Sequence, residues 1–157
     1  MAFEHYIQNG ARKLRCGYTT GTCAALAAAR AAEQLLTGQA PERVSLVTPK
    51  GWQVEAELLH TALVGGVSTA AVAKDAGDDV DVTNGMLVFA DVCLSRHPGI
   101  RIDGGEGIGR VTKPGLDQPV GAAAINSVPR RMITEQVSLV CEEAEYSGGL
   151  QVIIRVP

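Results

Sequence analysis

The sequence predicts an α+β domain built from several short strands and two main helices. Six segments have the alternation or the β-branched composition of strands, and two have the composition and end signals of helices. The 157 residues fit one ordinary domain, and a hydrophobic fraction of 46% with 20% charged residues is typical of a globular protein. Many strands combined with few helices indicate the α+β class.

The first helix is expected over Cys23–Leu36, where alanine and leucine dominate. Thr20 or Thr22 could cap its start, and Gly38 is placed to end it. Because alanine side chains are small, this helix should lie close against a sheet.

Next in the chain, Arg43–Thr48 and Trp52–Leu58 are predicted to pair as a hairpin. Apolar and polar residues alternate in both segments, and Pro49–Gly51 supplies a turn between them. Val64–Ala73 is expected to form one strand with a kink at its glycine pair. Three further strands are expected, at Met86–Ser95, Ile108–Thr112 and Leu150–Val156.

The second helix is expected to begin at Ser127, with Pro129 in its first turn, where a helix tolerates the missing N–H. Apolar residues at helical spacing should form the stripe that faces the core. The members of this stripe are Val128, Met132, Ile133, Val137 and Val140.

Composition argues against several classes of function. A net charge of −3 disfavours a general nucleic-acid binder, and no apolar run approaches the roughly 20 residues that a membrane span needs. Residues 1–15 lack the apolar segment of a signal peptide. No CxxC pair occurs among Cys16, Cys23, Cys93 and Cys141, so no metal site is expected. Reduced thiols in a cytoplasmic protein are the simplest interpretation.

Two loop segments could bind a ligand. Gly17–Thr22 precedes the first helix, so backbone N–H groups and threonine hydroxyls could hold an anion there, with an ordinary capped helix as the alternative. Lys74–Gly85 carries four aspartates, among them Asp75, Asp78 and Asp79, which could hold a cation, orient a base or bind ligand hydroxyl groups. The alternative is a solvated acidic turn, since the spacing is not that of an EF-hand.

Two later segments have similar potential. The five glycines of Gly104–Gly115 would let the backbone approach a ligand closely, but the Rossmann spacing is absent and a glycine-rich hairpin is the alternative. Arg130 and Arg131 stand in the first turn of the second helix, where positive charge opposes the helix dipole. A bound carboxylate ligand would make the interaction at this helix start favourable, because arginine grips carboxylates. The alternative is that both arginines are simply solvated.

Together these segments resemble the cobalt-precorrin-5B C1-methyltransferases, often called the CbiD type. Each matching segment alone is weak, whereas four in the family's order are highly specific. The segments are Leu14–Ala32, Lys74–Gly85, Gly104–Leu116 and Ala124–Ile133. The chain departs from the family at Ala122, Ala123 and Ser127, where a glutamate and two prolines are usual.

The resemblance implies methylation of carbon 1 of cobalt-precorrin-5B by S-adenosylmethionine, giving cobalt-precorrin-6A in anaerobic cobalamin (vitamin B12) biosynthesis. It also implies a mixed-sheet fold similar to the second domain of ribosomal protein S5, circularly permuted. Residues 1–157 would be the N-terminal domain of such an enzyme. A C-terminal Rossmann-like domain, the expected S-adenosylmethionine site, is absent, and the end of the chain at a strand favours truncation.

The resemblance also implies roles for individual residues, since the substrate carries many carboxylates that helix starts and basic side chains could bind. The substrate-binding residues would be Thr19, Thr20, Gly21, Thr22, Lys113, Arg130 and Arg131. Loop-orienting or cofactor-facing roles would fall to Asp75, Asp78, Asp79, Gly105, Glu106 and Gly107. No catalytic base is assigned. A non-catalytic tetrapyrrole-binding or interaction module and a small-molecule kinase of S5-like fold are the alternatives.

Overall fold

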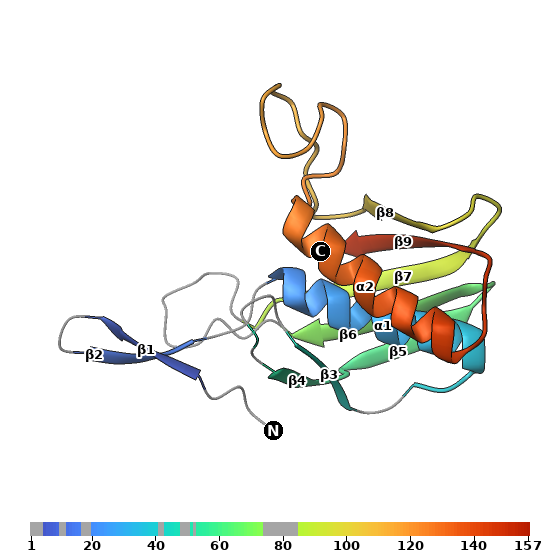
Figure 1. The fold of residues 1–157 in the computed structure, drawn as a ribbon, viewed down its shortest axis with the longest axis horizontal. Helices are drawn as coiled ribbons and strands as arrows, with labels where there is room; N and C mark the ends of the chain where they lie inside the picture. Colours follow the sequence, from blue (N-terminus) through green and yellow to red (C-terminus); the bar gives the residue numbers. More distant parts are fainter. Residues whose placement is uncertain are drawn as a thin grey trace.

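Helices α1 (Thr20–Thr37) and α2 (Ser127–Glu143) lie side by side across one face of a sheet (Figure 1). The computed structural model describes residues 5–9, 12–16, 20–40, 43–47, 51, 53–73 and 85–157. In these residues the sheet has five strands, in the order β5 (His60–Val64), β6 (Val67–Ala73), β7 (Leu87–Ser95), β9 (Gly149–Arg155) and β8 (Ile100–Gly104). Two separate hairpins pair β1 (His5–Asn9) with β2 (Arg12–Cys16) and β3 (Arg43–Val47) with β4 (Gln53–Glu57).

Strand direction decides which loops meet. Strands β5, β6, β7 and β9 pair antiparallel in that order, whereas β8 pairs parallel with β9. Strands β6, β8 and β9 therefore run in the same direction and finish at one end of the sheet. Both α1 and α2 begin at that end (Figure 1), which is called the helix-start end below.

The core lies between the helices and the sheet. From Cys23 to Ala29 every residue of α1 is buried, and the alanines let the helix backbone approach the strands closely. Helix α2 contributes Ile133 and Val137, both fully buried. Alternate residues of β7 and β9 complete this core, which confirms that the alanine-rich first helix lies close against a sheet.

The opposite face of the sheet carries a polar cluster. Asp91 of β7 accepts hydrogen bonds from the Thr69 hydroxyl at 2.6 Å and from Arg155 Nε at 2.5 Å. The Arg155 guanidinium also lies 4.7 Å from the centroid of the Phe89 ring. Burial alone would raise the pKa of the Asp91 carboxyl, but the hydrogen bonds and the positive charge of Arg155 outweigh burial and hold that pKa below its usual value.

Most of the predicted elements are confirmed. The first helix ends as expected, since Gly38 adopts φ 78° and donates its N–H to the Gln34 carbonyl at 2.8 Å. The hairpin of β3 and β4, the strands β7 and β9, and helix α2 all lie where the sequence predicts them. In the part of the chain that the structure describes, no helix combines the length and the hydropathy of a membrane span.

Three predictions about local structure are wrong. Val64–Ala73 was expected to be a single strand. Instead, Gly65 and Gly66 have φ of 60° and 80° and form a two-residue turn, so Val64 ends β5 and Val67 begins β6 of a hairpin. Ile108–Thr112 is not a strand, and its Arg110 forms an isolated bridge with Ala123. Val128 is 45% exposed and does not join the apolar stripe of α2.

Candidate functional site

The starts of α1 and α2 are in contact at the helix-start end. A Cβ atom added to Gly21 would lie 3.0 Å from the Pro129 side chain, so a larger residue at position 21 would press on the first turn of α2. The Cys23 thiol contacts the Ala73 carbonyl oxygen at 3.8 Å, which places the start of α1 beside the last residue of β6. The acidic segment Lys74–Gly85 follows Ala73 in the sequence, and its residues before Gly85 lie outside the described part of the chain.

The glycine-rich segment reaches the same end because it leaves β8 beside the end of β9. Gly105 donates its N–H to the Ile154 carbonyl at 2.9 Å, and Val156 donates to the Glu106 carbonyl at 2.8 Å. Gly107 has φ 81°, and a Cβ atom there would overlap the Val156 carbonyl oxygen. These glycines therefore permit close backbone contact with β9, which is a structural use of the motif.

Residues 105–126, called the connecting loop below, join β8 to α2 and rise away from the body of the molecule (Figure 1). Their two legs pair through backbone bonds, from Val111 N–H to the Ala122 carbonyl at 2.9 Å and from Gly121 N–H to the Val111 carbonyl at 2.8 Å. Lys113 lies on this loop and is exposed. The connecting loop leaves the end of β8 and enters the start of α2, so Lys113 lies on the segment that joins these two elements.

The first turn of α2 already holds an internal carboxylate. Asp117 of the connecting loop accepts a hydrogen bond from the Ser127 N–H at 2.5 Å and another from the Ser127 hydroxyl at 3.0 Å. Asn126, the residue before the helix, makes no side-chain cap. The Ser127 backbone bond, with the side-chain bonds of Gln118 and Ser127, lowers the pKa of the Asp117 carboxyl. This cap was not predicted, because its partners lie ten residues apart.

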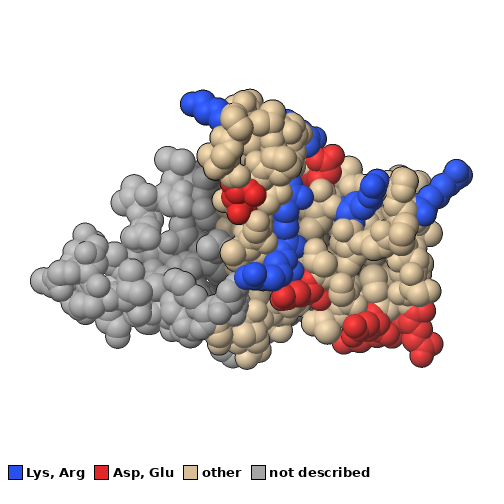
Figure 2. Space-filling model, turned by 45° about the horizontal axis from the view of Figure 1, so that its top comes forward, with Lys and Arg blue, Asp and Glu red and all other residues tan. Residues whose placement is uncertain are grey.

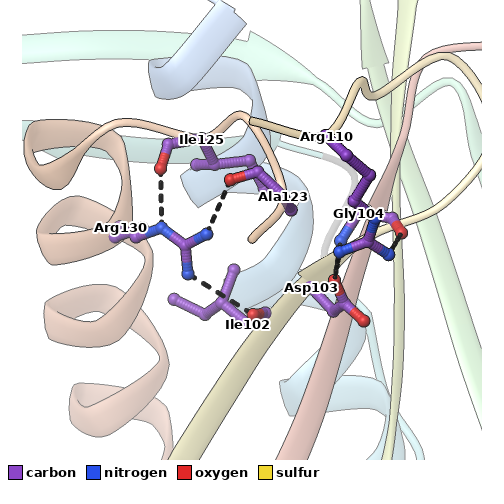
Figure 3. Close-up of polar contacts among 7 residues, drawn as sticks. All are labelled: Ile102, Asp103, Gly104, Arg110, Ala123, Ile125 and Arg130. Atoms are coloured by element: carbon purple, nitrogen blue, oxygen red, sulfur yellow. Dashed lines mark hydrogen bonds and ion pairs between the residues drawn. The ribbon is translucent and has the colours of Figure 1, made fainter. Parts of the chain in front are cut away.

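The arginines at the start of α2 have different environments (Figure 3). Arg130 donates to the carbonyl oxygens of Ile125 at 2.6 Å, Ala123 at 2.9 Å and Ile102 at 3.5 Å. Arg131 is exposed, and among the described residues its one ion pair is with Glu135, one helical turn later, at 4.0 Å. Arg131 is therefore available to a ligand, whereas much of the Arg130 guanidinium is already bonded within the protein.

A further ion pair secures the beginning of the connecting loop. Arg110 donates to the Asp103 carboxylate at 2.6 Å and to the Gly104 carbonyl at 3.2 Å (Figure 3). The hydrogen bond from Arg110, followed by that from the Gly104 N–H, lowers the pKa of Asp103. Neither Arg110 nor Asp103 stands out in the sequence as a candidate for this contact.

The helix-start end therefore gathers most of the proposed site residues that the structure describes. Thr20 and Gly21 are half-buried, and Glu106, Gly107, Lys113 and Arg131 are exposed. Thr22 is only 2% exposed, so its side chain faces the interior and not the surface that a ligand would reach. Thr19, Asp75, Asp78 and Asp79 lie outside the described residues.

Charge at this end suits an anion. Figure 2 shows basic side chains in a band that starts beneath the connecting loop, with acidic side chains beside it. Because α1 begins here, the partial positive charge of its dipole adds to that of Arg131, whereas the Ser127 N–H at the start of α2 is already bonded to Asp117. Backbone N–H groups at helix starts and guanidinium groups are the donors that carboxylates prefer.

Neither a metal cluster nor an activated thiol is found in the described part of the chain. No three His, Cys, Asp or Glu side chains come together there as metal ligands would. Cys23 is fully buried at the start of α1, and burial raises the pKa of the Cys141 thiol. Burial favours the protonated, unreactive form of the Cys141 thiol, so Cys141 is not a candidate nucleophile.

The chain is similar to known proteins in sequence and in structure. The CbiD family model matches residues 7–157. Cobalt-precorrin-5B C(1)-methyltransferases of Pseudomonas savastanoi pv. phaseolicola and Geobacillus kaustophilus are 51% and 49% identical to this chain, over 91% and 93% of its length. The chain spans only 39% of the length of either relative.

A solved structure, a cobalamin biosynthesis protein (cbiD) from Archaeoglobus fulgidus, is 33% identical with a TM-score of 0.65. The match covers 95% of this chain and 46% of that chain. Sequence and backbone similarity thus extend over nearly the whole of the present chain. The protein belongs to the CbiD family.

Proposed function

We propose that this chain forms the substrate-binding part of a methyltransferase that converts cobalt-precorrin-5B to cobalt-precorrin-6A in cobalamin biosynthesis. The relatives in Pseudomonas and Geobacillus bear the name of this activity. The observation that carries the proposal is the meeting of α1, α2 and the glycine-rich segment at the helix-start end. A substrate with many acetate and propionate groups needs several anion-binding groups in one place, and this end provides them.

In this proposal the chain binds and orients the macrocycle. Thr20, Gly21 and Arg131 would contact carboxylates at the helix starts, and Lys113 would contact them from the connecting loop. Thr19 remains a proposed contact, as do Asp75, Asp78 and Asp79 in their loop-orienting or cofactor-facing role. Holding the ring carbon in line with the methyl donor and excluding water would supply most of the rate enhancement.

S-adenosylmethionine would supply the electrophilic methyl group, from a site in another part of the enzyme. The described residues do not build a Rossmann-type cofactor loop, because β8 continues into the connecting loop and not directly into a helix. The backbone of Gly105 and Gly107 is also packed against β9. We therefore place the cofactor site in a C-terminal Rossmann-like domain, within the length that the relatives have beyond this chain.

We further propose that residues 1–157 are the N-terminal domain and have the circularly permuted S5-like fold. The mixed sheet with both helices on one face supports this assignment. The parallel pair β8 and β9, joined through α2, forms one β-α-β unit within an otherwise antiparallel sheet.

The proposal is tested by titrating the purified chain with cobalt-precorrin-5B and following the absorbance of the macrocycle. Binding is expected, and Arg131→Ala or Lys113→Ala should each weaken it by roughly three- to tenfold, the effect of one exposed charged contact. Arg96→Ala is the matched control, since Arg96 is an exposed arginine on the turn before β8, at the opposite end of the sheet. Absence of binding, or an equal loss in the control, would refute the proposed site.

Catalysis is tested separately by adding S-adenosylmethionine and the remaining part of a relative, expressed as a second polypeptide. Formation of cobalt-precorrin-6A, identified by mass spectrometry, is the expected outcome. Binding without methylation in this reconstituted mixture would favour a non-catalytic tetrapyrrole-binding module.

A further inference from the structure

We infer that Arg130 is a positioning residue, whose guanidinium sets the direction of the connecting loop and thereby the place of Lys113. The inference concerns how the site is held, and its ligand-binding part rests on the proposed function. It replaces the expectation that Arg130 itself binds a carboxylate, because its donors point to backbone carbonyl groups.

The contacts of Arg130 join three parts of the chain. Its Nε donates to the Ile125 carbonyl and its Nη2 to the Ala123 carbonyl, both on the leg of the connecting loop that descends into α2. Its Nη1 lies 3.5 Å from the Ile102 carbonyl oxygen on β8. One planar group therefore ties the descending leg and the first turn of α2 to the edge strand of the sheet (Figure 3).

The other leg is held by a second arginine. Arg110 bonds to Asp103 and to the Gly104 carbonyl, at the end of β8. The backbone bond from Ala124 N–H to the Gly109 carbonyl, 2.8 Å long, then connects the legs between these two anchors. Both legs are thus fixed to the same strand at the base of the loop.

The outer part of the loop has little packing of its own. Ala123 and Ile125 at the base are buried, whereas Leu116 and Val120 farther out are 61% and 58% exposed. The contact of Asp117 with Ser127 is exposed to solvent. Because few apolar contacts hold the outer part, its direction depends on the polar anchors at the base.

The chemistry of guanidinium suits this role better than that of an ammonium group. A positive charge in the first turn of α2 opposes the helix dipole, so its position needs a compensating interaction. The fixed fork of arginine donates in several directions within one plane, whereas a lysine ammonium is a compact point charge. Lysine at position 130 would keep the charge but could not reach all three carbonyl groups.

The test compares Arg130→Ala, Arg130→Lys and the control Arg131→Ala by hydrogen exchange of single amides, measured by NMR. The informative amides are Val111, Gly121 and Ala124, whose bonds hold the legs together. Both Arg130 variants should exchange roughly tenfold faster at these amides, since the loss of a partly buried anchor lowers the local opening energy. The control should leave exchange unchanged.

Binding of uroporphyrin III, a tetrapyrrole with carboxylates on every ring, supplies the second measurement. If Arg130 positions the loop, Arg130→Lys should bind this probe as poorly as Arg130→Ala does. If Arg130 instead contacts a carboxylate, Arg130→Lys should recover much of the affinity while exchange at the three amides stays at the parent rate. That second pattern would overturn the inference.

The measurements separate the inference from the proposed function. Hydrogen exchange needs no ligand, so it decides the role of Arg130 even if the parent chain fails to bind the probe, a result that would count against the proposed function alone. If Arg130→Ala does not fold, as judged by circular dichroism, Arg130→Lys and Arg110→Ala give the same readout. Unchanged exchange in both of these variants would also overturn the inference.

Discussion

Replacing Gly107 with alanine should destabilise the fold through two separable effects. Gly107 has φ 81°, a left-handed conformation that costs an L-residue about 1–2 kcal/mol. The added Cβ would also overlap the Val156 carbonyl oxygen, so the hydrogen bond from Val156 to Glu106 must lengthen or break. A lost backbone bond costs a further ~1 kcal/mol, which gives a total of about 2–3 kcal/mol.

Two other glycines isolate these effects. Gly115 has φ 84° but nothing within 4 Å of an added Cβ, so Gly115→Ala should cost only about 1 kcal/mol after the smaller entropy of the unfolded chain is included. Gly149 has no positive φ, yet a Cβ there would overlap the His97 carbonyl oxygen. Gly149→Ala should therefore show the cost of overlap alone, roughly 1–3 kcal/mol.

Urea unfolding and thermal unfolding, both followed by circular dichroism, compare all three variants with the parent. For a domain of this size, Gly107→Ala should lower the melting temperature by roughly 5–10 °C and Gly115→Ala by about 2–4 °C. If Gly107→Ala costs no more than Gly115→Ala, close contact with β9 is not the reason for glycine at position 107, and the structural interpretation of this motif is refuted.

Two further predictions concern the core and the open face of the sheet. Ile133→Ala, at a fully buried position, should cost roughly 2–5 kcal/mol in urea unfolding, whereas Leu139→Ala, at an exposed position of the same helix, should stay within about 0.5 kcal/mol. Asp91→Asn should destabilise the protein at pH 7. The folded protein lowers the pKa of the Asp91 carboxyl, so the ionised carboxylate stabilises the fold at pH values above the unfolded pKa near 3.8. This difference should shrink as pH falls below 3.8, and a constant difference in unfolding free energy down to pH 2 would contradict the role of the Arg155 ion pair.

Helices were the easiest elements to predict, because their signals are local. Composition and Gly38 mark the extent of α1, and Pro129 marks the first turn of α2. The glycine pair of the β5–β6 hairpin carries a weaker signal, since consecutive glycines fit a kink as well as a turn. Strand β8 has almost no local signal: it carries Arg101 and Asp103, and its parallel partner lies about fifty residues later.

The candidate site was predictable only in part, for the same reason. The order of the motifs indicated a family, but nothing in their spacing showed that Gly21 would meet Pro129. Composition likewise presented Arg130 and Arg131 as equivalent, although tertiary structure gives Arg130 three carbonyl partners and leaves Arg131 exposed. Partners distant in sequence decide which charged groups remain available to a ligand.

The strand directions have a practical consequence for handling this protein. The turn at Gly65 and Gly66, residues 96–99 and residues 144–148 all lie at the end of the sheet away from the starts of α1 and α2. Surface turns of this kind tolerate insertions better than packed elements do. A fluorophore, an affinity tag or an immobilising linker at the exposed turn of Gly65 and Gly66 would leave the helix-start end unobstructed during measurements.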